Sequence, residues 1–206
     1  MSFDKDAKDW DKDPKKVERA KIFAKEINDF IKPNEVMKAM EFGCGTGLLS
    51  YELKEAFHSI TLVDNSQGMI EVLQEKIKND GIKNFTPIYS NLLEEDLNQN
   101  DFDVIYTLMT LHHIIDLDKI LQIFNSMLKS NGYFCIADLV KEDGSFHSDS
   151  STFNGHNGFD KDELSAILLK NGFEMKSYKI CTESEREIDG KIKKYPLFLM
   201  VVEKIN

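Results

Sequence analysis

Three glycines and two carboxylates near residue 40 are the residues whose types and spacing best suit ligand chemistry. The glycines stand in the run Gly43-Cys44-Gly45-Thr46-Gly47, with Glu41 two residues before it and Asp64 at the end of the next apolar segment. Glycine adopts positive φ without steric cost and lets a ligand approach the backbone closely. The helical pattern that begins at Leu48 would direct its free N–H groups to the same place. Because a carboxylate such as Asp64 can accept hydrogen bonds from both hydroxyls of a ribose, these residues predict a site for a nucleoside-containing cofactor.

The spacing of the glycines distinguishes between cofactors. A dinucleotide-binding turn has the spacing G-x-G-x-x-G and directs a helix N-terminus at a pyrophosphate, whereas this chain has G-x-G-x-G. Glu41 suits a cationic or hydrogen-bond-donating ligand better than a pyrophosphate. An ordinary glycine-rich turn and a nicotinamide-dependent reductase remain alternatives, and the position of the third glycine counts against the reductase.

The run from Glu41 to Gly47 closely resembles the signature loop of class I S-adenosylmethionine-dependent methyltransferases. In that family the loop wraps the methionine part of the cofactor, and the acid after the second strand holds the ribose. The resemblance covers residues 35–140, and the runs Met109–Ile114 and Ala137–Leu139 are similar to bacterial small-molecule methyltransferases. It implies S-adenosylmethionine as cofactor and methyl transfer to a small-molecule acceptor. A noncatalytic protein that binds the same cofactor as a sensor stays an alternative.

The resemblance also implies a set of cofactor-contacting residues at the carboxyl ends of the strands, where doubly wound sheets bind ligands. This set is Glu41, Gly43, Cys44, Gly45, Gly47, Asp64, Asn65, Met69, Asn91, Leu92, Thr107 and His112. Glu41 would anchor the amino-acid end of the cofactor, whereas Thr107 and His112 would line the transfer site. Met69, Asn91 and Leu92 would frame the adenine. Many family members carry aspartate at the position of Asn91, whose amide oxygen can still accept a hydrogen bond from the adenine amino group.

Two histidines, His112 and His156, are candidate general bases, because imidazole titrates near neutral pH. A metal site is the alternative interpretation: His112 and Asp116 have i, i+4 spacing, and His147 and His156 could complete a ligand set. Adjacent histidines such as His112 and His113 point in different directions on a helix, and no Cys or Glu cluster accompanies them. We therefore expect no metal.

Alternating strand and helix patterns position these residues. Strands are expected at 36–42, 59–63, 83–89, 101–106 and 133–139, and helices at 14–30, 47–57, 66–79, 116–128 and 160–170. Segments 173–188 and 191–203, around Asp189-Gly190, predict a hairpin. The alternation predicts an α/β fold, a parallel sheet with helices on both faces. The resemblance adds a doubly wound, seven-stranded, mostly parallel sheet of order 3-2-1-4-5-7-6 with the last strand antiparallel.

Two segments outside this alternation are expected to cover the site. Residues 1–34 form an N-terminal helical cap, in which Trp10 could fold over the cofactor. Residues 141–159 lack clear periodicity, and a loop of this length in a compact domain is usually functional or disordered, so we interpret it as a substrate loop.

Composition limits the partners and the compartment. A chain of 206 residues fits one methyltransferase domain over residues 1–206. The net charge of −10 argues against nucleic acid as the main partner. No apolar stretch approaches the about 20 residues of a spanning helix, and Met1–Asp13 is not a signal peptide. The widely spaced Cys44, Cys135 and Cys181 predict reduced thiols in a cytoplasm. The sequence does not indicate an oligomeric state.

Overall fold

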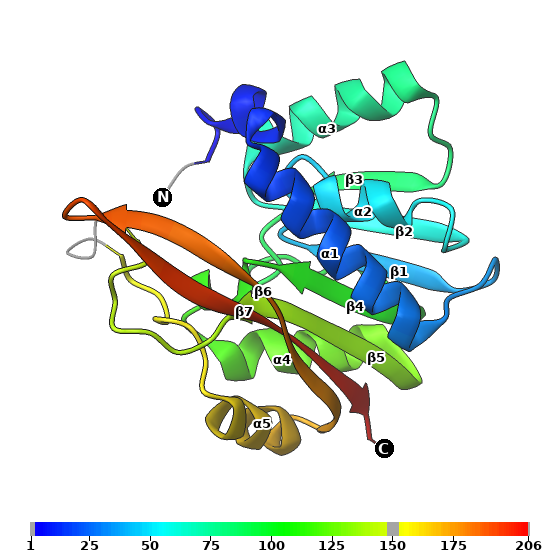
Figure 1. Ribbon diagram of the computed structural model, residues 1–206. Coiled ribbons are helices and arrows are strands. Elements are labelled where there is room, and N and C mark those ends of the chain that lie inside the picture. Colours follow the sequence, from blue (N-terminus) through cyan, green and yellow to red (C-terminus); the bar gives the residue numbers. More distant parts are fainter. Residues whose placement is uncertain (1–2, 148–152, 206) are drawn as a thin grey trace.

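A single seven-stranded sheet organises the computed structural model, which describes residues 3–147 and 153–205 (Figure 1). The strands are β1 (Lys38–Phe42), β2 (Ser59–Asp64), β3 (Phe85–Tyr89), β4 (Phe102–Leu108), β5 (Leu128–Leu139), β6 (Phe173–Ile188) and β7 (Lys191–Lys204). Their order is β3-β2-β1-β4-β5-β7-β6. Strands β1 to β5 pair in parallel, whereas β7 is antiparallel to both β5 and β6. The predicted fold class, strand order and antiparallel last strand are thus confirmed.

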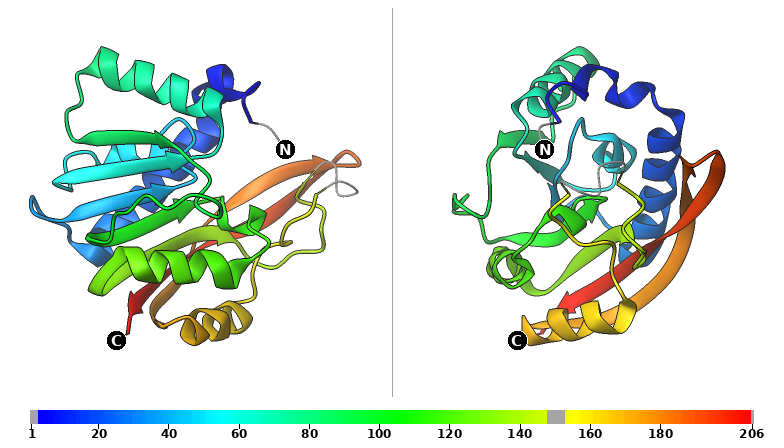
Figure 2. Two further views of the ribbon diagram at one scale, coloured as in Figure 1. Left: turned by 180° about the vertical axis from the view of Figure 1, so that it is seen from behind. Right: turned by 90° about the vertical axis from the view of Figure 1, so that its left-hand side faces the viewer.

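Helices cover both faces of the sheet (Figures 1 and 2). The helices are α1 (Pro14–Ile31), α2 (Leu48–Leu53), α3 (Gln67–Asp80), α4 (Leu117–Met127) and α5 (Lys161–Lys170). Side chains of α1, α2 and α3 share one buried cluster, and those of α4 and α5 share the other. Neighbouring strand residues point to opposite faces, and so Ala39 belongs to the first cluster and Met40 to the second.

Side chains that cap the N-terminus explain where two of the helices begin. Asp13 accepts a hydrogen bond from the Lys15 amide at 2.9 Å, ahead of Pro14 at the first position of α1. Ser66 caps α3 by accepting from the Met69 amide at 3.3 Å. A capping side chain satisfies an amide that the helix itself leaves unpaired, so these local signals were sufficient to locate the helix starts.

Two element bounds differ from expectation more than the others do. Helix α2 ends at Leu53 rather than at residue 57, and the Asn84 side-chain amide donates to the carbonyls of Lys54 and Phe57 at 2.8 and 3.2 Å. Strand β5 begins at Leu128 rather than at residue 133, and Asn131 lies inside the strand with φ of 61°. Both differences depend on partners distant in sequence, which local patterns do not reveal.

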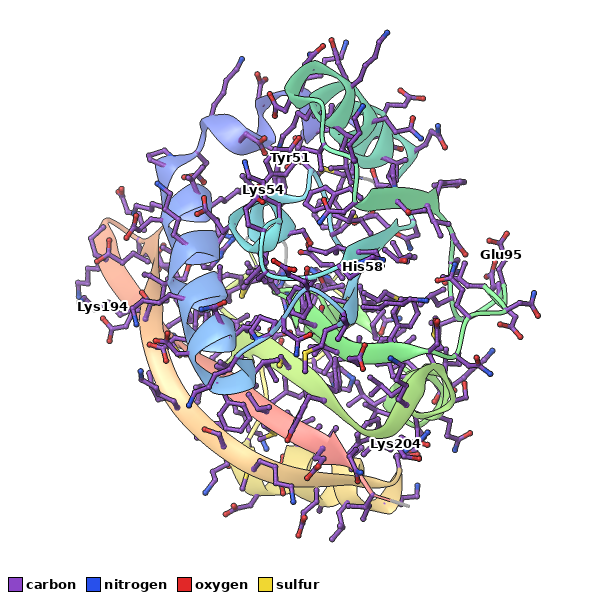
Figure 3. All side chains as sticks on the ribbon, turned by 90° about the vertical axis from the view of Figure 1, so that its right-hand side faces the viewer. Tyr51, Lys54, His58, Glu95, Lys194 and Lys204 are labelled. Carbon is purple, nitrogen blue, oxygen red and sulfur yellow. The ribbon has the colours of Figure 1, made fainter. Side chains whose placement is uncertain are left out.

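Charges of both signs cover the outer surface, as Lys54, Glu95, Lys194 and Lys204 illustrate (Figure 3). Lys204 also supports a helix end, because its ammonium donates to the carbonyls of Asn125 and Leu128 at 2.6 and 2.8 Å near the C-terminus of α4. Within the described ranges, no helix has both the length and the apolar character needed to cross a membrane.

Candidate functional site

The glycine turn after β1 requires glycine for both conformation and space. Gly43 has φ of +68°, and a Cβ there would lie 2.2 Å from the Thr110 side chain. Gly47 has φ of +81°, and a Cβ there would lie 2.7 Å from Leu73. The Gly43 amide donates to the Val63 carbonyl at 2.8 Å. The turn is therefore packed between the end of β2 and the segment after β4, at the edge of the sheet where the parallel strands end.

Asp64 lies against this turn at the end of β2. One carboxylate oxygen accepts from the Gly45 amide at 2.7 Å and the other from the Ser66 amide at 2.8 Å. Burial raises the pKa of Asp64, and the backbone amides oppose that rise. A carboxylate oxygen has two lone pairs, so each oxygen retains capacity for a ligand hydroxyl.

Glu41 is buried under the turn. One of its oxygens accepts from the Ser50 amide at 3.2 Å and from the Ser50 hydroxyl, which lies 2.7 Å from the Tyr106 hydroxyl. Burial raises the pKa of Glu41 to about 8, so the carboxyl is mostly protonated at neutral pH. The structure thus shows Glu41 linking β1 to α2, and its contact with the amino end of a cofactor stays a prediction.

Cys44 offers its backbone rather than its thiol. The side chain is buried, and burial raises the pKa of the thiol well above its usual range. A thiol is nucleophilic only as the thiolate, which agrees with the expectation that this position makes a backbone contact.

The predicted adenine-contacting residues are in different environments. Met69 is buried, and its sulfur lies 3.9 Å from the point where a Cβ on Gly45 would sit. Leu92 is buried in the second core cluster, and Asn65 is exposed. The Asn91 side-chain oxygen accepts from the Leu93 amide at 3.2 Å. Of this group, Met69 is the residue that the structure brings to the glycine turn most directly.

The N-terminal segment lies over the turn, in a short helix η1 (Ala7–Lys12) and the residues before it. The Trp10 indole nitrogen lies 3.8 Å from the Cβ position of Gly45. Asp4 accepts from the Ser66 hydroxyl and the Gly68 amide at 2.6 and 2.9 Å. Trp10 therefore lies beside the glycine turn, and its contact with a bound cofactor stays a prediction.

Two further contacts hold this segment in place. The Asp11 carboxylate accepts from the Thr46 hydroxyl and pairs with the Lys76 ammonium at 2.6 Å. Lys76 also donates to the Thr46 carbonyl at 2.8 Å. Sequence reasoning missed Asp4, Asp11 and Lys76, because charged residues in a charged segment resemble an ordinary solvated surface.

His112 and Asp138 form a buried pair at the carboxyl ends of β4 and β5. The His112 Nδ1 atom lies 2.6 Å from one Asp138 oxygen, and the His112 backbone amide donates to the other at 3.1 Å. The carboxylate therefore favours the tautomer with the proton on Nδ1 and leaves a lone pair on Nε2. Asp138 was not predicted as a site residue, although its place at the end of a strand was a usable signal.

Thr107 has a structural role beside this pair. Its side chain is fully buried, and its hydroxyl donates to the Phe42 carbonyl at 2.8 Å, linking β4 to β1. The expectation that Thr107 lines the transfer site stays a prediction.

Two more histidines surround His112. The imidazole centroid of His112 lies 4.2 Å from that of His113 and 5.2 Å from that of His147, and His147 stacks on Phe153 at 3.7 Å. Burial, followed by the nearby His112, lowers the pKa of His113 to about 3 and that of His147 to about 4. Both rings are therefore neutral at physiological pH.

The premise of the predicted metal alternative was wrong. His112 lies in the short helix η2 (Leu111–His113), whereas Asp116 caps α4 by accepting from the Lys119 amide at 3.0 Å. The two residues do not share a helix face, and the group of possible metal ligands that the structure brings together is His112, His113 and His147.

His156 lies beside the segment that carries His112. Its Nε2 atom lies 2.9 Å from the Ile114 carbonyl, and its amide donates to the His112 carbonyl at 2.7 Å. Because a carbonyl can only accept, Nε2 carries the proton, which leaves Nδ1 as the nitrogen with a lone pair, and the role of His156 as a base stays a prediction. Of the predicted substrate loop 141–159, residues 148–152 lie outside the described residues, and the flanking parts border the histidine cluster.

Arg19 of α1 is a further residue that sequence reasoning missed. Its Nε atom is buried and has no hydrogen-bond partner within the described chain. Burial lowers the pKa of its guanidinium, and the carboxylates of Asp13 and Asp138 oppose that shift. An amphipathic helix pattern gives no indication that one of its charges is directed inward.

Comparisons with known proteins agree with this geometry. A family profile described as "Methyltransferase domain" matches residues 33–188. An uncharacterized methyltransferase of Schizosaccharomyces pombe is 34% identical over 128 residues, which cover 59% of this chain and 45% of that protein. A ubiquinone biosynthesis O-methyltransferase of Pelagibacter ubique is 32% identical over 110 residues, which cover 53% of this chain and 45% of that protein. The chain thus spans less than half the length of these curated relatives.

Solved structures share the fold at low sequence identity. A SAM-dependent methyltransferase from Aquifex aeolicus superposes with a TM-score of 0.69 and 20% identity over 92% of this chain and 98% of its own. A second structure is a phosphoethanolamine N-methyltransferase of Haemonchus contortus in complex with phosphomonomethylethanolamine and S-adenosylhomocysteine. It has a TM-score of 0.71 and 14% identity, over 89% of this chain and 52% of its own. The chain belongs to the methyltransferase domain family and has the fold of class I S-adenosylmethionine-dependent methyltransferases, whose cofactor is S-adenosylmethionine.

The residues around the turn fit this cofactor. S-adenosylmethionine brings ribose hydroxyls, an ammonium and a sulfonium, all of which suit the carboxylates of Asp4, Asp11 and Asp64. A pyrophosphate would meet the same three carboxylates as like charges. Beside Gly45, the Trp10 indole and the Met69 thioether offer surfaces against which an adenine ring can pack.

Proposed function

We propose that the protein transfers the methyl group of S-adenosylmethionine to a small-molecule acceptor beside His112. One observation carries this proposal: the glycine turn, Asp64 and the His112–Asp138 pair converge at the same edge of the sheet. When bound, the cofactor supplies an electrophilic methyl carbon on a sulfonium that becomes a neutral thioether. The protein must then bind, align and exclude water from the reactants.

The residues of the turn would hold the cofactor. Asp64 would accept the ribose hydroxyls, and the backbone of Gly43, Cys44 and Gly45 would face the methionine part. Met69 and Trp10 would contact the adenosine and exclude water from it. Arg19, whose buried Nε lacks a partner within the described residues, would bind a carboxylate of the cofactor or the acceptor.

The His112 Nε2 atom would face the acceptor. Asp138 holds the opposite ring nitrogen, so the lone pair on Nε2 is available to contact an acceptor hydroxyl or amine. A carbon or thiolate acceptor would need no base.

Three observations support a small acceptor. The N-terminal segment and the substrate-loop residues on either side of 148–152 cover the edge of the sheet where transfer would occur. The net charge of −10 disfavours nucleic acid. The names of the Pelagibacter and Haemonchus proteins also describe small-molecule methyltransferases.

The test is release of S-adenosylhomocysteine from S-adenosylmethionine in the presence of pooled hydroxyl, amine, thiol and carbon acceptors. Acceptor-dependent release that His112→Ala lowers by at least tenfold would support the proposal. Tight cofactor binding without turnover on any pool would favour the noncatalytic alternative.

A further inference from the structure

Three histidines from two separate segments bring their ring nitrogens together on the acceptor side of the site. His112 and His113 follow β4, and His147 follows β5 in the loop that begins at residue 141. One nitrogen of each ring lies within 4.8 Å of the others. The chain has five histidines, so three of the five converge here.

We propose that His112, His113 and His147 bind one divalent transition-metal ion, with zinc the best match, in a site that leaves a coordination position open to the acceptor. The existence of the site does not depend on the proposed function, whereas its role in holding the acceptor does.

The three imidazole ligands determine which metal ions suit the site. Neutral imidazole suits Zn, Cu, Fe and Ni, whereas Mg²⁺ and Ca²⁺ prefer oxygen ligands. Nitrogen ligands at about 2.0–2.1 Å from zinc lie about 3.4 Å apart in tetrahedral geometry. The observed spread of up to 4.8 Å means that binding an ion would draw the three rings closer together. Three protein ligands plus one open position are characteristic of catalytic rather than structural zinc sites.

Asp138 provides the outer contact that a metal-binding histidine normally makes. Its carboxylate lies 2.6 Å from His112 Nδ1 and accepts from the backbone amides of His112 and Leu139 at 3.1 and 2.7 Å. Such a carboxylate fixes the ring and directs the other nitrogen at the metal. His112 and Asp138 are both buried, so water cannot reach the Nε2 lone pair of His112 from the side of Asp138.

The surroundings of His147 are independent evidence for the metal site. Its Nδ1 atom is buried and has no hydrogen-bond partner among the residues that the structure describes. The ring is held by stacking on Phe153 with an interplanar angle of 9°. A polar atom that is buried without a partner is costly, and a metal ion would satisfy it.

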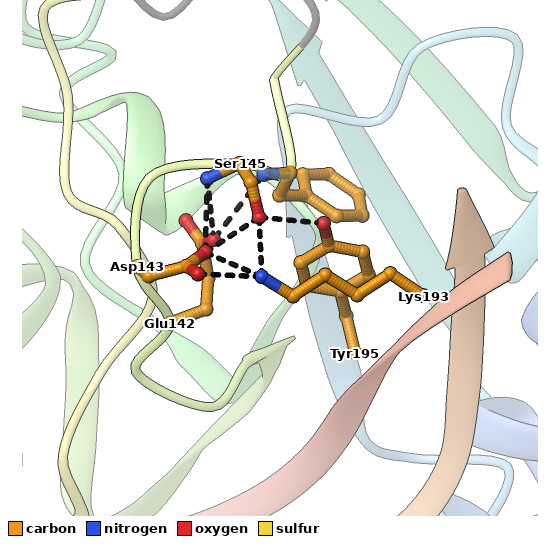
Figure 4. Close-up of polar contacts among 6 residues, drawn as sticks. Glu142, Asp143, Ser145, Lys193 and Tyr195 are labelled. Atoms are coloured by element: carbon orange, nitrogen blue, oxygen red, sulfur yellow. Dashed lines mark hydrogen bonds and ion pairs between the residues drawn. The ribbon is translucent and has the colours of Figure 1, made fainter. Parts of the chain in front are cut away.

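The loop that carries His147 is fixed to β7 (Figure 4). Lys193 contacts both Asp143 oxygens at 2.7 and 2.6 Å and the Ser145 hydroxyl at 2.6 Å. The Ser145 hydroxyl also lies 2.8 Å from the Tyr195 hydroxyl, and Glu142 accepts from the Ser145 amide at 2.8 Å. His147 lies two residues beyond Ser145, so the anchored segment holds His147 in a defined position.

In the metal-bound form, Nε2 of His112 is a ligand rather than a base. The metal would then hold an oxygen or nitrogen of the acceptor and lower its pKa. This assignment narrows the acceptor to molecules with a hydroxyl, phenol or amine that can coordinate.

The test uses the full chain with its affinity tag removed, stripped with EDTA and titrated with Zn²⁺ and, separately, Co²⁺. The variants are wild type, His113→Asn, His147→Ala and, as a matched control, His58→Ala. His58 is an exposed histidine on another part of the surface (Figure 3). Calorimetry gives stoichiometry and affinity, and Co²⁺ absorption reports coordination geometry.

We expect one ion per chain, binding weakened at least tenfold by His113→Asn and by His147→Ala, and no change for His58→Ala. The proposal would be overturned if the wild type bound no Zn²⁺. It would also be overturned if the Zn²⁺ affinity of the wild type differed less than twofold from that of both His113→Asn and His147→Ala. S-adenosylhomocysteine affinity is measured on the same samples, so failure of the metal site and failure of the proposed cofactor site are distinguishable.

Discussion

At the scale of single residues, buried ionisable groups define this site. Glu41, Asp64 and Asp138 lie under or beside it, each held by amide or hydroxyl donors from its surroundings. Such donors partly offset the cost of removing a carboxyl from water. The site is therefore prearranged by its own hydrogen bonds.

Glu41 should make stability depend on pH. Its pKa is raised from 4.5 to about 8 by burial. Between these values the unfolded chain has lost the proton that the folded chain keeps, so stability falls as pH rises. The slope is at most about 1.4 kcal/mol per pH unit. We expect the melting temperature of wild type to fall relative to that of Glu41→Gln between about pH 5 and pH 8.

An exposed glutamate of the neighbouring helix α2, Glu52, provides the control variant Glu52→Gln. A difference between wild type and Glu41→Gln that stays constant over this pH range would contradict the account of Glu41.

Asp138→Asn tests how His112 is positioned. The neutral amide holds the imidazole more weakly than the carboxylate does, so Zn²⁺ affinity should fall about 10–100-fold. S-adenosylhomocysteine affinity should not change, because Asp138 contacts His112 and Leu139 rather than the glycine turn. An unchanged Zn²⁺ affinity in a folded variant would contradict the positioning role.

At the scale of elements, two segments outside the strand–helix alternation cover the site. The N-terminal segment lies over the glycine turn, and the loop after β5 borders the histidine cluster. Each is attached by polar contacts and by a buried apolar side chain, Ala7 in the first segment and Phe146 in the second.

The N-terminal segment should report cofactor binding through its fluorescence. Trp10 is the only tryptophan and lies beside Gly45. We expect S-adenosylhomocysteine to shift its emission. Asp11→Asn, which weakens the contacts to Thr46 and Lys76, should reduce the affinity several-fold. Unchanged emission at saturation, established by calorimetry, would show that Trp10 is remote from the bound cofactor.

Lys193→Met should release the loop that carries His147. The expected result is weaker Zn²⁺ binding with little change in the melting temperature, because the contacts are near the surface. Lys194→Met is the matched control, since Lys194 is the next residue and pairs only with Glu183, at 2.8 Å, among the described carboxylates. Equal Zn²⁺ affinity in the two variants would contradict a role of this anchor.

The fold was more predictable than the site, for physical reasons. Apolar periodicity and turn residues are local, and they predicted most of the elements. The order of the strands was implied by the family resemblance that the glycine turn carries. The pairing of His112 with Asp138 and the approach of His147 are contacts between distant segments. The i, i+4 spacing of His112 and Asp116 was misleading because the chain leaves the helical path between them.

At the scale of the whole molecule, the doubly wound sheet brings the separate parts together. The carboxyl ends of β1 and β2 supply the glycine turn and Asp64, and those of β4 and β5 supply the histidines and Asp138. Because these strands are parallel neighbours, the cofactor side and the acceptor side lie at one edge. A sheet of this kind places ligands at the point where its strand order reverses.

The most direct test of the central claim is thermal unfolding with S-adenosylmethionine, S-adenosylhomocysteine, NADH or NADPH added separately. A ligand at 100 times its dissociation constant stabilises the folded state by about 2.7 kcal/mol, which should raise the melting temperature by roughly 5–10 °C for a chain of this size. We expect this rise with the two sulfur nucleosides and none with the nicotinamides. A rise with NADH or NADPH alone would contradict the assignment of the glycine turn and of the mechanism built on it.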